Sequence, residues 1–186
     1  MNVDSLPWTE DEAANRLLAA DPLALMIGML LDQQFPMERA FYAPYLLSGR
    51  LGHELSAAAI ADHDPDAFVA IFKGPPALHR FPGSMAKRTQ AFCTALVEEY
   101  DGNASAVWRS ADDADDLYQR LRRLPGFGEA KARIFVGIVG KRLGEGPTGW
   151  ESVAADWPSI ADVDSWERVA ELRAEKKKMK EAATKK

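Results

Sequence analysis

The chain has 186 residues, of which 47% are hydrophobic, and a formal net charge of −5. This length suffices for one domain with a buried core, and the acidic balance argues against a surface coated in positive charge for bulk nucleic-acid binding. The single cysteine, Cys93, excludes an intrachain disulfide and a four-cysteine iron–sulfur cluster. His53, His63 and His79 lack metal-ligand spacing, so we expect surface or capping roles for them and no bound metal.

The N-terminal sequence predicts neither secretion nor membrane insertion. The chain starts with an acidic segment, and no apolar signal region follows it. The most apolar run, residues 23–31, is too short to span a bilayer. We therefore expect a cytoplasmic, nucleoid-associated protein.

Helix signals follow one another along the first hundred residues, and no strand pattern interrupts them. Thr9, with Glu12 three residues later, forms a capping-box pattern, and Asp21 followed by a proline predicts the start of a second helix. Pro44 should bend or split the third helix near Ala43. The predicted helices cover residues 9–20, 37–51, 55–61, 65–72 and 84–100, and one more begins at residue 22 and ends within residues 30–37.

Residues 124–132, Leu-Pro-Gly-Phe-Gly-Glu-Ala-Lys-Ala, predict a tight turn between two helices, 115–124 and 131–140. Pro125 fixes φ, and Gly126 and Gly128 permit backbone conformations and close approaches that a Cβ would block. Free N–H groups at the positive end of a helix dipole suit a phosphate. Seven positive residues against one negative residue lie between 120 and 142, where phosphate contacts would form.

This turn resembles the L-P-G-x-G-x-x-x-A hairpin of the helix-hairpin-helix (HhH-GPD) DNA glycosylase superfamily, which includes endonuclease III and the alkyladenine and oxoguanine glycosylases. Polymerases, ligases and recombination proteins also use such a hairpin as a sequence-independent DNA clamp. Residues 30–37, with Gln33 and Gln34, resemble the family's L-L-S-x-Q or L-x-x-Q-Q signature, and residues 83–92 resemble its G-x-x-x-x-K-A segment. In the family, a glutamine at the position of Gln34 fills the gap left by an extruded nucleotide.

The resemblance implies an all-α fold of two helical lobes with the hairpin at the mouth of a cleft. Residues 1–186 would form a single domain with a core at about 22–143, a second lobe completed by the N-terminal helix and residues 144–172, and a basic tail at 173–186. It implies a monomer that binds double-stranded DNA. It implies no iron–sulfur cluster in this chain, because the cysteines are missing, and it allows a monovalent cation at the hairpin.

Glycosidic cleavage in this family needs an ionised carboxylate near the sugar. The family's spacing places that carboxylate at residues 148–150, Thr-Gly-Trp, which contain none. The nearby candidates are Glu151, Asp156 and Asp164, and Asp164 lies in a segment similar to the family's I-x-V-D-T. The family's strand-nicking lysine would fall on Ala130, so Lys131 is expected to contact phosphate and lyase activity is not expected.

The sequence therefore predicts a base excision repair glycosylase, with a non-catalytic binder of damaged or abasic DNA as the alternative. A protein-interaction domain that binds no DNA is a third reading. The expected DNA contacts are Gly126, Phe127, Gly128, Lys131, Gln34 and Lys87. Lys87 fits a solvated helix face as well as a DNA contact. Trp150, Trp157 and Trp166 fit core packing as well as base stacking. The basic tail could equally lie along DNA or solubilise the chain.

Overall fold

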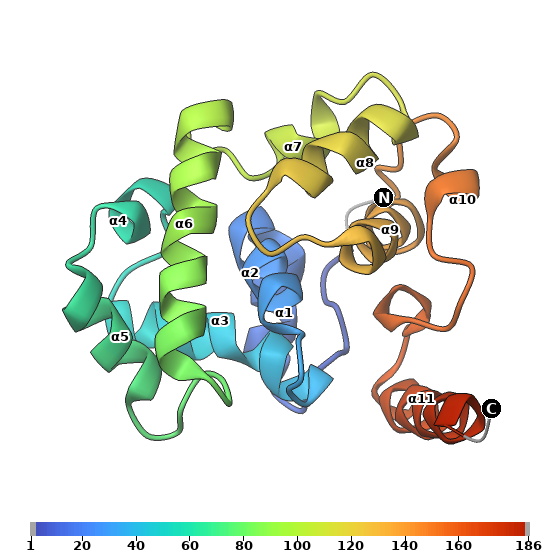
Figure 1. Cartoon of the computed structure of the whole chain (residues 1–186), viewed down its shortest axis with the longest axis horizontal. Coiled ribbons are helices and arrows are strands. Elements are labelled where there is room, and N and C mark those ends of the chain that lie inside the picture. Colours follow the sequence, from blue (N-terminus) through green and yellow to red (C-terminus); the bar gives the residue numbers. More distant parts are fainter. Residues whose placement is uncertain (1–2, 185–186) are drawn as a thin grey trace.

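The computed structural model describes residues 3–184, and all regular structure in that range is helical (Figure 1). This confirms the all-α prediction. The helices are α1 Glu12–Ala20, α2 Pro22–Leu31, α3 Met37–Leu51, α4 Ala57–Ala61, α5 Pro65–Lys73, α6 Pro82–Tyr100, α7 Ala106–Arg109, α8 Ala114–Arg123, α9 Glu129–Gly137, α10 Trp150–Val153 and α11 Trp166–Thr184. A π-helical turn, Ile138–Arg142, extends α9, and a 3-10 turn, Ile160–Asp162, precedes α11.

Aspartate side chains begin several of these helices. The Asp21 carboxylate accepts hydrogen bonds from the backbone N–H groups of Leu23 and Ala24, as its sequence context predicts. The N-cap of α1 is Asp11, whose carboxylate accepts from the N–H of Ala14, so the prediction of Thr9 as the cap is wrong. The Thr9 hydroxyl instead binds the buried Asn15 side chain at 2.9 Å.

Two other helix predictions differ from the structure. The helix α3 has the predicted ends and continues through Pro44 without a split, because the proline and its neighbour Ala43 are buried in the packing that holds α3. The helix α6 begins at Pro82, with Phe81 as N-cap, so the predicted Gly83-Ser84 cap is not used.

The helix α2 lies in the middle of the molecule. Nine of its ten residues are buried, and it contacts α1, α3, α6 and α9. A Cβ added to Gly28 would lie 2.6 Å from the Phe41 ring, so this glycine permits the close approach of α2 and α3. On one side α4 and α5 pack on α6, and on the other α8, α9 and α10 pack together (Figure 1). The end of α2 therefore lies where the two groups of helices meet.

The two ends of the described chain join one hydrophobic core, which runs from Leu6 to Leu172. The indole N–H of Trp8 donates to the carbonyl oxygen of Val163 at 3.1 Å. Residues 173–184 of the predicted basic tail belong to α11, which is anchored by the buried Val169 and Leu172, and residues 185–186 lie outside the described part of the chain. Among residues 3–184, no single helix is long and apolar enough to cross a membrane; only α1 and α2 taken together, across a bend of 111°, meet that test of length and composition.

Candidate nucleic-acid interface

The glycine turn of residues 125–128, called the bend below, connects α8 to α9 as predicted. Gly126 has φ 86°, and a Cβ there would lie 2.3 Å from Leu30 Cδ1 and 3.0 Å from Arg88 Cδ. The bend therefore rests directly on α2 and α6 through a position that only glycine can fill. Gly128, the N-cap of α9, is exposed, and no side chain caps the first turn of that helix. The exposed start of α9 thus presents backbone N–H groups outward.

Phe127 does not belong to the exposed part of the bend. Its side chain is 3% exposed, stacks on Phe92 with ring centroids 5.7 Å apart and meets the Phe135 ring edge-on. Its N–H already donates to the carbonyl oxygen of Leu124 at 3.1 Å. The Phe127 ring therefore belongs to the core, and the expected contact of this residue with DNA stays a prediction.

Lys131 also points inward. Its ammonium group donates to the carbonyl oxygen of Leu30 in the last turn of α2, where a cation is favoured by the helix dipole. Burial lowers the pKa of Lys131 to about 8; the nearby Asp32 opposes this change, and Arg88 adds to it. In this structure the amine therefore fastens the hairpin helix to α2, and the expected contact of Lys131 with phosphate stays a prediction.

Residues 32–36, called the glutamine loop below, follow α2. His79 accepts the backbone N–H of Phe81 on Nδ1, so its Nε2 carries the proton and donates to the carbonyl oxygen of Gln33 at 3.0 Å. Arg88 donates to the side-chain oxygen of Gln33 at 3.1 Å. His79 and Arg88, both distant in sequence, therefore hold this loop, while Lys131 holds the end of α2 that precedes it.

Gln34 occupies the exposed part of the glutamine loop. Its backbone is left-handed, with φ 52°, a conformation that costs energy for a residue with a side chain. The neighbouring Gln33 carries the hydrogen bonds that fix the loop, which leaves the amide of Gln34 presented to solvent. Gln34 is exposed, and its expected entry into the duplex stays a prediction.

His79 shows why the loop is hard to predict. The sequence suggested a surface or capping role, but the residue is 2% exposed and packs between Phe35 and Phe81. Burial lowers the pKa of His79, and its hydrogen bonds to the backbone of Gln33 and Leu31 oppose that shift. The surface prediction is therefore wrong for His79.

Asp32 is the carboxylate that the structure brings next to Lys131. Burial raises the pKa of Asp32, Lys176 and Lys131 oppose that shift, and Glu38 adds to it. Asp32 lines a cavity of about 820 Å³, called the glutamine cavity below, whose wall also includes Gln34, Glu38, Arg80, Lys176 and Lys177. One feature of the sequence could have identified Asp32 as a site residue: its carboxylate directly follows an apolar helix that is buried in the structure.

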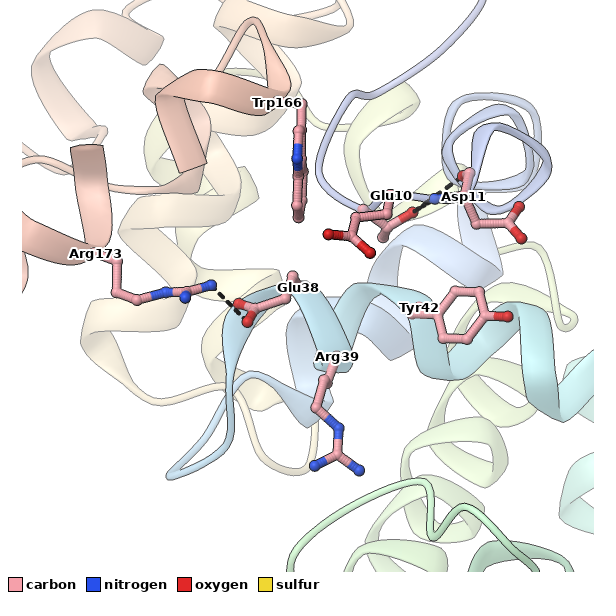
Figure 2. Close-up of a pocket in the computed structure, with 8 residues that line it drawn as sticks. Glu10, Asp11, Glu38, Arg39, Tyr42, Trp166 and Arg173 are labelled. Carbon is pink, nitrogen blue, oxygen red and sulfur yellow. Dashed lines mark hydrogen bonds and ion pairs between the residues drawn. The ribbon is translucent and has the colours of Figure 1, made fainter. Parts of the chain in front are cut away.

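A second cavity of about 600 Å³ lies beside the start of α11 (Figure 2). We call it the indole cavity, and its wall includes Trp166, Tyr42, Glu10, Glu38, Arg39 and Arg173. Arg173 pairs with Glu38, and both residues also line the glutamine cavity. The two cavities are therefore neighbours that share one ion pair.

The three carboxylates predicted from the family's spacing lie elsewhere. Glu151 is in α10, Asp156 follows that helix, Asp164 lies just before α11, and all three are exposed. Trp150 packs over Gly140 and Gly146, so its role is packing. Lys87 is exposed on α6. Within residues 3–184, no group of three His, Cys, Asp or Glu side chains is arranged to hold a metal ion.

Comparisons with protein-family models, with curated proteins and with solved structures found no match for this chain.

Proposed function

We propose that this protein is a DNA base excision repair glycosylase with a two-lobed HhH-GPD-like fold, which hydrolyses the N-glycosidic bond of a damaged or mispaired base. The observation that carries the proposal is the attachment of the bend and of α9 to Leu30, in the last turn of α2, which the glutamine loop follows. Gly126 packs on Leu30, and Lys131 donates to the carbonyl oxygen of the same residue.

Because of this attachment, the bend and the glutamine loop would act as one rigid unit that binds DNA in two ways. The uncapped first turn of α9 would bind phosphate oxygens through its backbone N–H groups. Gln34, four residues after Leu30, would enter the duplex and replace an extruded nucleotide, since its amide can donate to and accept from base edges. The bend packs on Leu30, and the glutamine loop follows that residue in the chain. The position of the bound phosphate would therefore determine where Gln34 enters the duplex.

The cleavage step needs a carboxylate close to the sugar, and Asp32 fits this requirement best. It lines the glutamine cavity together with Gln34, so a nucleotide displaced by Gln34 would be near its carboxylate. The alternatives predicted from the sequence are tested beside Asp32 in the cleavage assay below, namely Glu151, Asp156 and Asp164. Lys131 is engaged with a backbone carbonyl, and we therefore propose hydrolysis without strand cleavage.

A cleavage assay on duplexes that carry uracil, 8-oxoguanine, alkylated purines or an abasic site tests this function. We expect base release from at least one lesion, and we expect it to be lost in D32N and kept in the matched variants E151Q, D156N and D164N. Borohydride should trap no covalent adduct with abasic DNA, because the amine of Lys131 is engaged with the carbonyl oxygen of Leu30. A trapped adduct that K131A abolishes would contradict the assigned role of Lys131.

The alternative function is a non-catalytic binder of damaged or abasic DNA, and the missing carboxylate at residues 148–150 favours it. Tight binding to an abasic duplex without release of any base would establish this alternative. Negligible duplex binding even at low salt, where phosphate contacts are strongest, would reject both DNA functions.

A further inference from the structure

The indole cavity contains a carboxylate that is only half satisfied. Glu38 lies in the first turn of α3, and its Oε1 pairs with a guanidinium nitrogen of Arg173. Its Oε2 is buried and has no hydrogen-bond partner in the part of the chain that the structure describes. A buried acceptor without a partner is unfavourable, so a ligand that bonds both oxygens would stabilise this site.

The group that now covers Glu38 is easily displaced. The Arg173 side chain is 60% exposed and contacts Glu38 through a single nitrogen, and exposed ion pairs contribute little to stability. Figure 2 shows Arg173 reaching across from α11 to Glu38, with the Trp166 ring on the other side of the opening. Movement of Arg173 would therefore free the Oε1 of Glu38 next to the aromatic surface of Trp166.

The hydrogen-bonding pattern of the Glu38 carboxylate indicates which ligand it would bind. An ionised carboxylate is an acceptor with two oxygens in one plane, which is why it pairs with the two parallel N–H donors of arginine. Guanine presents the same in-plane pair of donors, N1–H and N2–H, on its Watson–Crick edge. Adenine and cytosine present one amino donor beside a ring acceptor that a carboxylate repels, and uracil presents one N–H between two carbonyl oxygens.

We propose that the indole cavity binds guanine or a guanine-derived base, which stacks on Trp166 and displaces Arg173 from Glu38. Trp166 provides the flat apolar surface that an extruded base requires. The displaced guanidinium is then free to bind a DNA phosphate. This inference deepens the proposed function and rests on it for the source of the base, which would arrive from the glutamine cavity through the shared residues Glu38 and Arg173.

The test measures binding of free nucleosides to the full chain by NMR titration. We expect 2′-deoxyguanosine and its 8-oxo form to bind about tenfold more tightly than 2′-deoxyadenosine, with 2′-deoxyinosine, which lacks the N2 amino group, in between. E38Q should weaken guanosine binding about tenfold, because the new amide places a donor against a donor. E12Q changes an exposed glutamate of α1 and should have no effect.

Two variants distinguish this binding site from a structural ion pair. R173M should tighten guanosine binding, because it removes the competitor for Glu38, whereas R168M should not, because Arg168 pairs with other residues of α11. W166L should weaken the binding of every nucleoside. Equal affinities for all nucleosides, or no effect of both E38Q and R173M, would overturn the inference.

Duplex binding measured on the same samples separates the two proposals. Guanosine selectivity without duplex binding would reject the proposed function and leave the cavity assignment standing. Base release that is equal for guanine-derived and other lesions, and unchanged in E38Q, would reject the cavity assignment alone.

Discussion

The two basic regions of this chain use their charges differently. Of the seven positive residues between 120 and 142, at least five form ion pairs or hydrogen bonds with other groups of the protein. Arg120 pairs with Asp116 at 2.8 Å, Arg133 pairs with Glu129 at 3.5 Å, and three others bind the side chain of Asp162 or backbone carbonyls, namely Lys141, Lys131 and Arg142. These charges hold the hairpin and the segment after it in place.

Three consecutive lysines of α11, residues 176–178, are more available to a ligand. Lys176 and Lys177 line the glutamine cavity, and Lys177 and Lys178 are exposed. The contrast teaches that a dense basic segment in the sequence does not by itself locate the phosphate contacts. We expect backbone N–H groups to bind the DNA phosphates near the hairpin, and cationic side chains to bind them along α11.

The largest effect should come from the glycine that attaches the bend to α2. G126A places a Cβ against Leu30 and imposes a positive φ on alanine, so we expect destabilisation of about 2–4 kcal/mol in urea unfolding. G128A is the matched control, because its Cβ would meet nothing within 4 Å. It should keep the stability and weaken duplex binding by crowding the phosphate. Equal stability of G126A and wild type would mean that the bend does not rest on α2.

The inward direction of Lys131 predicts a pH dependence of stability. The folded-state pKa of about 8 is lower than the ordinary value of 10.5, so the unfolded state binds the proton more tightly. Stability should therefore rise as the pH increases from about 8 to about 10.5, and it should not depend on Lys131 below about 8, where both states bind the proton. The gain is at most about 3 kcal/mol, since one pKa unit corresponds to about 1.4 kcal/mol.

The comparison of wild type with K131M isolates this gain, because all other titrating groups are common to both proteins. The difference between their unfolding free energies should change across this pH window. Parallel curves would show that the Lys131 amine is in contact with solvent.

A moderate effect should follow from charge reversal on α11. K177E/K178E should lower duplex affinity about tenfold and reduce the slope of log K against log salt by about two. R133E/K141E makes the same change of charge on the hairpin side, where both residues are already paired, and should leave the slope unchanged. The opposite ranking would place the phosphate contacts on the hairpin side.

The smallest effect concerns the left-handed residue of the glutamine loop. Q34G should raise stability by up to about 1 kcal/mol, because glycine adopts a positive φ without strain, and should slow base release. Asp101 has φ 51° at the end of α6, so D101G should bring a similar gain in stability without any change in activity. Equal activity of both variants would show that Gln34 does not enter the duplex.

Local signals in the sequence determined the helices and the bend. Asp21 and Pro22 start α2 through hydrogen bonds to residues two and three positions away, and the ends of α3 agree with the prediction. The glycines of the bend act within the same few residues. Because such interactions involve near neighbours in the chain, the sequence alone is sufficient to predict them.

Only the tertiary structure decided which side chains face the candidate site. Lys131 binds a carbonyl 101 residues away, and Arg88 binds a side chain 55 residues away. Whether Phe127, His79 and Lys131 face the core or solvent depends on which helices pack against them. The carboxylate beside Lys131 is Asp32 for the same reason, since α2 and α9 meet only in the folded chain. Burial and charge pairing across such distances are properties of the packed core, which periodicity and local motifs do not specify.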